Sequence, residues 1–534
     1  MDKILILDFG SQTTQLIGRR IREFGVYTET LAGDADLSDI LGDGKNGAGG
    51  IRGVILSGSP ESVYEKDSPA PDRRVYSCGL PLLGICYGLQ RMNYDSGGTV
   101  ESLPQREYGA VKVSVTADSG ALSANGALFL EAAGLSGREF TSWMSHGDSL
   151  GKLAPGFIQA AKSETGFPAI VFHNEKPWYG LQFHPEVTHC EKGTEILSAF
   201  VFTSCRCEKS WTMEAYVEEI RAELASRVAS APVLLLISGG VDSSVAAALL
   251  LKTLGADQVH LMYMDTGLMR KDETAQVRTA LEKLGARHVH VVMCGEEFLA
   301  ALRGKSGPEE KRKCIGDLFM TIQEREVARL ELDDSYFLAQ GTLYTDLIES
   351  GKGVGRKARV IKSHHNVGTP LVDAKRRQGR IIEPLDKLYK DEVRALGRLL
   401  GVDEEVVRRH PFPGPGLAVR ILGEVTREKC DILREADAIF VSELKKRRLY
   451  DEIWQAFAVL LSIRSVGVAG DVRKYGWVLA LRAITSADGM TADVYPFPSK
   501  DLIEISTLIT NTVKEIGRVT YDISSKPPAT IEWE

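Results

Sequence analysis

The N-terminal part of the chain alternates short apolar runs with glycine-rich turns. Runs of this kind occupy residues 4–7, 53–56 and 81–85. Continuous apolar runs that end in Gly or Ser are typical of strands buried on both faces, as in an open α/β sheet. We therefore expect residues 1–205 to form an α/β domain.

A polar segment at 205–209 predicts a linker, and the residues after it predict a helix. Apolar side chains recur there at helical spacing: Met213, Tyr216, Val217, Ile220, Leu224 and Val228. We interpret them as the packed face of a connecting helix.

A second alternating pattern begins at Pro232. The predicted elements are strands at 233–237, 259–264 and 288–293, a helix at 241–254 and another helix that closes near residue 284. Strands that alternate with helices at this spacing imply right-handed βαβ units and a parallel sheet. Residues 206–408 are therefore expected to form a second α/β domain.

The pattern weakens after the glycine- and basic-rich stretch 351–380, and the proline-rich segment 410–416 interrupts any regular element. We expect residues 409–534 to form a small α+β domain. The predicted fold class is thus α/β, with two doubly wound open-sheet domains followed by this C-terminal domain.

Composition narrows the class of protein. Of the 534 residues, 43% are hydrophobic and 26% are charged, which is ordinary for a globular protein. The formal net charge is −7, whereas nucleic-acid binders usually carry a basic surplus, so we expect no nucleic-acid partner. No apolar stretch approaches the ~20 residues of a membrane helix, and the first apolar run is too short for a signal peptide. The sequence predicts a cytoplasmic protein with no membrane contact.

Eight cysteines are scattered along the chain, without the spacing of a disulfide framework. Cys205 and Cys207 lack the second pair or nearby histidines that a zinc site needs, so we interpret them as ordinary thiols.

Cys86 has a different setting, in Gly84-Ile85-Cys86-Tyr87-Gly88 between an apolar run and a segment that can start a helix. Small residues two positions before and after a nucleophile permit the tight turn of a nucleophile elbow. That turn aims a helix N-terminus at the thiol and favours the reactive thiolate. A buried structural cysteine is the alternative interpretation.

A candidate base lies in the segment Gln182-Phe183-His184-Pro185-Glu186. On an extended segment, residues two apart share a face, so Glu186 can bond one imidazole nitrogen of His184. The other nitrogen can then take the thiol proton of Cys86. An isolated His-Pro-Glu would be interpreted as a loop, but with the elbow it predicts a catalytic triad.

These two segments resemble the class I glutamine amidotransferases, and residues 8–12 (DFGSQ) and 144–148 (MSHGD) resemble the GMP synthetase branch of that family. The resemblance implies glutamine hydrolysis through a glutamyl-thioester on Cys86, with release of ammonia. By the same resemblance, further residues would hold glutamine or form the oxyanion hole: Gly58 and Tyr87 through backbone N–H groups, and Gln90, Ser145, His146 and Asp148 around the substrate.

Ser59 departs from the family, which usually has glycine at this position. A backbone donor survives such a change if the local φ is open to a residue with a Cβ atom.

A second motif, Ser238-Gly239-Gly240-Val241-Asp242-Ser243-Ser244, lies between an apolar strand and an apolar helix. Glycines let the backbone approach phosphate oxygens, while hydroxyls and helix N-terminal amides donate hydrogen bonds. The motif lacks the Gly-Lys-Ser/Thr of a Walker A loop. It resembles the ATP-pyrophosphatase loop, which implies adenylation of a substrate. We expect Mg²⁺ to accompany ATP, with Asp242 as a ligand, and no organic prosthetic group.

Basic residues cluster farther along, from Lys311-Arg312-Lys313 onward. A solvated basic face is the default interpretation. The glycine-flanked stretch around Lys362 instead predicts a mobile lid over anionic substrates.

The glutaminase and the adenylating loop leave the ammonia acceptor open, with XMP and nicotinate adenine dinucleotide among the candidates. Four C-terminal segments resemble GMP synthetase: 409–416, 470–473, 488–493 and 525–534. This resemblance implies that XMP is the acceptor, contacted by Arg312, Lys362, Lys526 and Glu532. It also implies a homodimer joined through the C-terminal domain.

The implied reaction has two steps. ATP adenylates the oxygen on carbon 2 of the xanthine ring and releases pyrophosphate, and ammonia then displaces AMP to give GMP. Such an enzyme is a carbon–nitrogen ligase with glutamine as the amido donor. A PP-loop enzyme that modifies tRNA is an alternative, opposed by the acidic balance and the glutaminase motifs. A non-catalytic paralogue is another, opposed by the intact Cys86, His184 and Glu186.

Overall fold

The computed structural model describes residues 1–41, 48–116, 122–332, 335–349, 370–469, 472–486 and 491–534. The chain divides into two compact units, one comprising Met1–Tyr216 and residues 345–349, and the other comprising Val217–Tyr344 and the described residues from 370 onward. Within these described ranges, no helix is long and apolar enough to cross a membrane.

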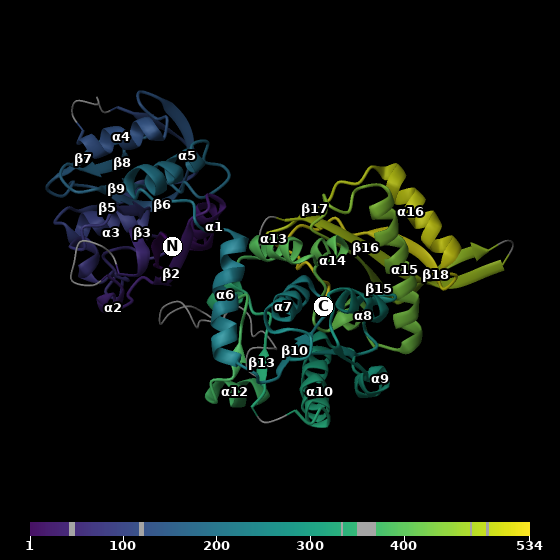
Figure 1. The fold of residues 1–534 in the computed structure, drawn as a ribbon. Helices are drawn as coiled ribbons and strands as arrows, with labels where there is room; N and C mark the ends of the chain where they lie inside the picture. Colours follow the sequence, from purple (N-terminus) through teal and green to yellow (C-terminus); the bar gives the residue numbers. More distant parts are fainter. Residues whose placement is uncertain (42–47, 117–121, 333–334, 350–369, 470–471, 487–490) are drawn as a thin grey trace. The chain divides into compact units, whose positions relative to one another are not determined.

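The first unit is built on a mixed sheet with strand order β2-β1-β3-β4-β9-β8-β7-β5-β6 (Figure 1). The strands from β2 to β9 in this order are parallel to their neighbours, and those from β9 to β6 are antiparallel. The strand bounds are β1 Lys3–Asp8, β2 Tyr27–Ala32, β3 Ile51–Leu56, β4 Leu82–Ile85, β5 Val100–Val115, β6 Glu139–Leu150, β7 Phe157–Ser163, β8 Pro168–His173 and β9 Trp178–Leu181.

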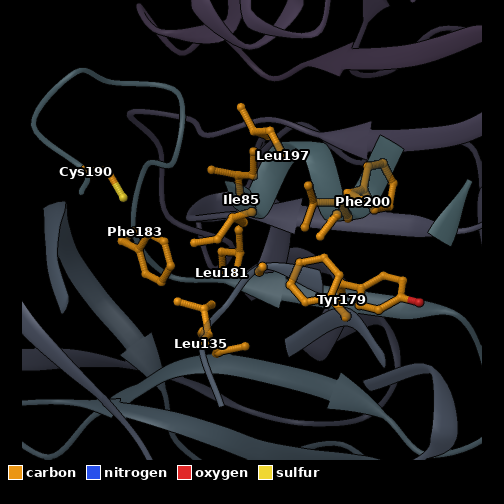
Figure 2. Close-up of a cluster of buried hydrophobic side chains, with 14 of the residues drawn as sticks. Ile85, Leu135, Tyr179, Leu181, Phe183, Cys190, Leu197 and Phe200 are labelled. Carbon is orange, nitrogen blue, oxygen red and sulfur yellow. The ribbon is translucent and has the colours of Figure 1, made fainter. Parts of the chain in front are cut away.

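Both faces of this sheet are covered. In β1, Ile4 and Ile6 belong to one apolar cluster, whereas Leu5 belongs to another. Figure 2 shows part of the first cluster, where Ile85 of β4 and Leu181 of β9 lie together. The prediction of strands buried on both faces is therefore confirmed. The helices of this unit are α1 (Thr14–Glu23), α2 (Ser38–Leu41), α3 (Tyr87–Asp95), α4 (Ala124–Ala132) and α5 (Gly193–Ser198).

The connecting helix that the apolar spacing predicts is α6 (Met213–Val228). The second unit then begins with a parallel sheet in the order β12-β11-β10-β13-β14. Three elements have the predicted bounds: β10 (Val233–Ile237), α7 (Val241–Leu254) and β12 (His288–Met293). The others are β11 (Val259–Asp265), α8 (Glu273–Lys283), α9 (Gly295–Leu302), α10 (Pro308–Arg329), β13 (Phe337–Ala339), α12 (Pro370–Arg377), β14 (Ile381–Ile382), α13 (Lys390–Leu400) and α14 (Glu404–Val407). Between β13 and α12 the chain forms α11 (Tyr344–Glu349), whose residues 345–349 group with the first unit.

The second unit also contains a separate sheet, in which β15, β16 and β17 are antiparallel and β18 pairs parallel to β16. An apolar cluster packs this sheet against helices and includes Phe440 of α15 and Ile505 of α16. This is the α+β arrangement that the sequence predicts for the C-terminal residues. The bounds are α15 (Arg427–Lys446), β15 (Gln455–Ala469), β16 (Val472–Thr485), β17 (Asp493–Val494), α16 (Ser499–Thr512) and β18 (Ile516–Tyr521).

Candidate active sites

Cys86 lies in the tight turn between β4 and α3. Its φ of +53° and ψ of −109° are unusual for a residue with a Cβ atom, as expected of a nucleophile elbow. The flanking glycines are sterically required. A Cβ atom on Gly84 would lie 2.6 Å from the backbone nitrogen of Leu89, and one on Gly88 would lie 2.2 Å from the carbonyl oxygen of Leu56.

His184 and Glu186 form a buried pair beside this turn. Nδ1 of His184 lies 2.7 Å from Oε1 of Glu186. Burial by itself lowers the pKa of His184, but the Glu186 carboxylate and the interaction with the Cys86 thiol raise that pKa well above its ordinary value. The imidazole is thus equipped to accept the thiol proton and to remain charged afterwards.

A chain of side-chain amides reaches the sulfur of Cys86 from the other side. Nε2 of Gln90 donates to the carbonyl oxygen of Asp148 at 2.8 Å and to Oε1 of Gln182 at 3.3 Å. Nε2 of Gln182 in turn lies 3.7 Å from Sγ of Cys86. No role for Gln182 was predicted from the sequence. The signal for it is the pairing of Ile85 with Leu181 in adjacent parallel strands, which places the next residue of each strand side by side.

The segment around Ser145 borders the same sulfur. The carbonyl oxygen of Ser145 lies 4.0 Å from Sγ of Cys86. The imidazole of His146 is buried, with Nδ1 2.9 Å from the carbonyl oxygen of Asp148 and Nε2 3.0 Å from Oε2 of Glu107. The distance between Nε2 of His146 and Oε2 of Glu107 is that of an ion pair, but the two groups are not aligned for a hydrogen bond. Burial raises the pKa of Glu107, but its interactions with His146 and with the hydroxyls of Thr165 and Ser163 outweigh this effect and leave the pKa below its usual value.

The predicted oxyanion-hole residues lie close to the triad. A Cβ atom on Gly58 would come within 3.3 Å of Cε1 of His184, so this backbone lies against the imidazole. Ser59 has a φ outside the left-handed region, and its hydroxyl accepts from the backbone N–H of Glu61 at 3.2 Å. Replacement of glycine by Ser59 therefore does not strain this turn. Tyr87 begins α3, where backbone N–H groups lack partners within the helix.

The serine- and glycine-rich loop connects β10 to the N-terminus of α7. Gly239 has a φ of +80°, and a Cβ atom there would lie 2.9 Å from Cγ2 of Val277. Arg409 donates to the carbonyl oxygen of Gly239 at 2.9 Å. The hydroxyls of Ser238 and Ser243 lie 3.2 Å apart, so they hold the two ends of the loop together. Val241, Asp242, Ser243 and Ser244 form the first turn of α7, as predicted.

Asp242 forms an ion pair with Lys390, at the first position of α13. Nζ of Lys390 lies 2.6 Å and 2.7 Å from the two carboxylate oxygens. Lys390 could not be predicted from the sequence, because 148 residues separate it from Asp242. No group of three His, Cys, Asp or Glu side chains that could hold a metal ion occurs within the described ranges.

The segment that contains Lys526 and Glu532 is firmly held in the second unit. Glu532 accepts two hydrogen bonds from the fully buried Arg420, at 2.9 Å and 3.0 Å, and one from Gln455 at 2.8 Å. Lys526 exchanges backbone hydrogen bonds with Ala492 at 2.8 Å and 3.0 Å.

Further cations contact this segment. Arg482 has 0% exposure and donates to Asp522 and to the carbonyl oxygens of Ser524, Thr530 and Ile531. Arg312 and Lys311 both contact Glu534. Of the predicted XMP residues, Lys362 lies outside the described residues.

One unit holds the elbow cysteine with its His–Glu pair, and the other holds the serine- and glycine-rich loop at a helix N-terminus. Together these features define an ATP-using glutamine amidotransferase. Family models agree with this order along the chain. Residues 5–204 match glutamine amidotransferase class-I, residues 218–304 match asparagine synthase, and residues 442–533 match the GMP synthase C terminal domain.

Curated relatives identify the family. The chain is 47% identical over 531 residues to "GMP synthase [glutamine-hydrolyzing]" of Aquifex aeolicus (strain VF5), which covers 99% of both chains. It is 47% identical to the Lactobacillus gasseri protein of the same name and 46% identical to that of Cronobacter sakazakii, and each alignment covers 100% of this chain and 98% of the relative. The chain belongs to the family of glutamine-hydrolysing GMP synthases.

A solved structure from Thermoplasma acidophilum, of a putative GMP synthase component, also matches part of the chain. The two are 31% identical, and the match covers 39% of this chain and 94% of that one with a TM-score of 0.33.

Proposed function

We propose that this chain converts XMP to GMP, using ATP and ammonia that its own first unit releases from glutamine. The observation that carries the proposal is the presence of the Cys86–His184–Glu186 arrangement and the serine- and glycine-rich loop in one chain of this family. The products are GMP, glutamate, AMP and pyrophosphate.

In the glutaminase half-reaction, the thiolate of Cys86 attacks the carboxamide carbon of glutamine. His184 takes the thiol proton and later gives it to the departing ammonia, while Glu186 fixes the imidazole orientation. The backbone N–H groups near Gly58 and at Tyr87 would stabilise the oxyanion.

Glutamine itself would be held from β6 and α3. We propose that Ser145, His146 and Asp148 shape this site together with Gln90. The support is that Gln90 and His146 both bond the carbonyl oxygen of Asp148, which ties helix and strand together.

In the adenylation half-reaction, the loop from Ser238 to Ser244 would hold the phosphates of ATP at the N-terminus of α7. Mg²⁺ commonly binds one or two carboxylates together with substrate phosphates, and Asp242 supplies one carboxylate at this loop. The residues present therefore fit Mg²⁺ with Asp242 as its protein ligand, and the ion would neutralise charge on the phosphates. Lys390 is a further cation that can reach the same phosphates, because it already reaches Asp242.

XMP is proposed to bind beside the segment that carries Lys526 and Glu532, with Arg312 and Lys362 as further contacts. The support is that Arg312 contacts Glu534, which lies two residues beyond Glu532 in the same anchored segment. A lysine ammonium suits a phosphate as a point charge.

A homodimer through the C-terminal residues is also proposed. Figure 1 shows the β15–β16 hairpin extending away from the helices of its sheet. Apolar side chains near its end are exposed: Val466 by 47%, Val468 by 77% and Tyr475 by 63%. Exposed apolar groups on such a ribbon favour burial against a second copy.

Two further predictions stay proposals. Domains at 1–205, 206–408 and 409–534 are supported by the sheets, since β1–β9, β10–β14 and β15–β18 each fall within one range. A cytoplasmic location is supported by the cysteines, all of which are free thiols.

The decisive test measures GMP formed from XMP, ATP and glutamine by the purified chain. Omission of XMP should abolish AMP release. Cys86→Ala should lose synthesis from glutamine and keep synthesis from ammonium salts, because ammonia then needs no thiol. Equal loss with both nitrogen sources would contradict the glutaminase role of Cys86. No GMP from the unmodified chain, with tRNA retained on a filter instead, would favour the tRNA-modifying alternative.

A further inference from the structure

The side chain of Gln182 contacts the nucleophile Cys86 but has no role in the triad scheme. It is fully buried, and its Nε2 atom lies 3.7 Å from Sγ of Cys86. Gln182 follows directly after strand β9, and Cys86 follows directly after strand β4. The backbone N–H of Cys86 donates to the carbonyl oxygen of Leu181 at 2.7 Å. The strand pairing therefore holds the two side chains together.

The orientation of the Gln182 amide follows from its partners. The carbonyl oxygen of Asp148 can only accept, so the Gln90 atom 2.8 Å from it must be the NH₂ nitrogen. The same nitrogen lies 3.3 Å from the Gln182 amide, whose facing atom must then be the oxygen. The NH₂ group of Gln182 is left pointing at the sulfur.

We propose that Gln182 is a further catalytic residue of the glutaminase, which donates an N–H hydrogen bond to the sulfur of Cys86 and thereby stabilises the thiolate. This inference rests on the proposed function, because it gives a role in that same glutamine hydrolysis. Gln90 acts as a positioning residue, since it sets the direction of the Gln182 amide.

The donor acts at the points of the reaction where sulfur carries negative charge. The thiolate attacks the carboxamide carbon, the new C–S bond forms, and the C–N bond breaks as the nitrogen takes a proton from the His184 imidazolium and leaves as ammonia. Water then gives a proton to the neutral His184 and attacks the thioester carbon, the C–S bond breaks, glutamate is released, and the sulfur departs as thiolate. An N–H donor lowers the free energy of sulfur before attack and on departure, because hydrogen bonds to charged groups are the stronger ones.

The competing interpretation is a purely structural one, in which Gln182 only fills space between Gln90 and Cys86. The two interpretations differ in one measurable property. A spacer leaves the ionisation of the thiol unchanged when a side chain of similar size replaces it, whereas loss of a donor makes the thiol harder to ionise.

The test uses Gln182→Met, which keeps the volume and removes the donor, and Gln182→Glu, whose carboxylate can still accept from Gln90. Gln159→Met, on β7, is the matched control. In each full-length protein, glutamine hydrolysis is measured between pH 5.5 and 9, together with alkylation of Cys86 by iodoacetamide, followed by mass spectrometry of its peptide.

For Gln182→Met we expect the acid limb of kcat/KM for glutamine, and the pH dependence of alkylation, to move up by about one pH unit, with roughly tenfold lower rates near neutral pH. In the Glu variant, the acid limb of kcat/KM and the pH dependence of alkylation should move up at least as far. In the Gln159→Met control, both profiles should match those of the unmodified chain. Unchanged profiles in the Met variant would overturn the proposal.

The two proposals fail in different ways. Folding of the first unit is checked by the thermal unfolding of each variant, and GMP synthesis from ammonium salts checks the second unit. If the unmodified chain makes no GMP from XMP, the proposed function fails, yet Cys86 alkylation still reports on Gln182. If Gln182→Met is too unstable to assay, Gln182→Leu, which also removes the donor without adding a charge, decides the matter through the same alkylation profile.

Discussion

Glu186 lies 2.7 Å from His184 and is almost fully buried, and its second oxygen has no hydrogen-bond partner among the described residues. Because this buried carboxylate has a single strong hydrogen-bond partner, its negative charge acts mainly on the imidazole of His184. It counteracts the desolvation of the imidazole and raises the pKa of His184. The proposed acid–base role of His184 therefore depends on the charge of Glu186.

This relationship predicts the effect of Glu186→Gln. The amide keeps the size of the side chain but loses the charge that holds the pKa of His184 high, so glutamine-supported synthesis should fall by about a hundredfold or more. Synthesis from ammonium salts should be unchanged. Glu195→Gln, at an exposed carboxylate on α5, is the matched control. Wild-type activity in Glu186→Gln would show that Glu186 does not orient the base.

The two glycines of the loop before α7 should differ in how well they tolerate substitution by alanine. Gly239 has a φ of +80° and meets Val277, whereas Gly240 has a φ of −77°, and a Cβ atom there would meet only Ser238 Oγ, at 3.3 Å. A left-handed φ costs a residue with Cβ about 1–2 kcal/mol. Gly239→Ala should thus lower pyrophosphate release from XMP and ATP by roughly tenfold or more, and Gly240→Ala by only a few-fold. The reverse order would contradict the described loop geometry.

Local elements were predictable from the sequence, but contacts between distant segments were not. The bounds of β10 and α7 follow from an apolar run that stops at Ser238-Gly239-Gly240 and an apolar helix after it. The nucleophile elbow and the catalytic triad could be predicted, because the small residues on either side of Cys86 and the two-residue spacing of His184 and Glu186 are visible in the local sequence. Gln182 and Lys390 could not, because their partners are set by strand order and by packing across 96 and 148 residues.

Acid sensitivity of the second unit is predicted from His410. Burial lowers its pKa to about 4, and neutral His410 accepts from the backbone N–H of Ala456 at 3.2 Å and donates to the carbonyl oxygen of Tyr450 at 2.9 Å. The unfolded chain binds a proton near pH 6.5, but the folded chain does not until about pH 4. This contribution to stability is therefore present above pH 6.5 and lost as the pH falls, by up to about 3 kcal/mol.

Urea unfolding at pH 7.5, 6 and 5 measures this effect. His410→Asn retains one donor and one acceptor but does not titrate, so its stability should depend less steeply on pH than that of the unmodified chain. Comparing the slope of stability against pH between the two proteins removes the contribution of the other titrating groups, which both proteins share. Equal slopes would show that His410 does not govern the acid sensitivity.

The segment from Lys526 to Glu534 provides the last prediction, because its anchoring distinguishes a substrate site from a loosely attached tail. Fully buried Arg420 pairs with Glu532, and loss of one partner of a buried ion pair destabilises by about 3–5 kcal/mol. Glu532→Gln, or deletion of 526–534, should therefore raise the KM for XMP at least about tenfold. The KM for glutamine should stay constant, because its proposed site lies in the first unit. Glu428→Gln, at an exposed position of α15, is the control. If the deleted chain kept its KM for XMP, Lys526 and Glu532 would not be part of the site.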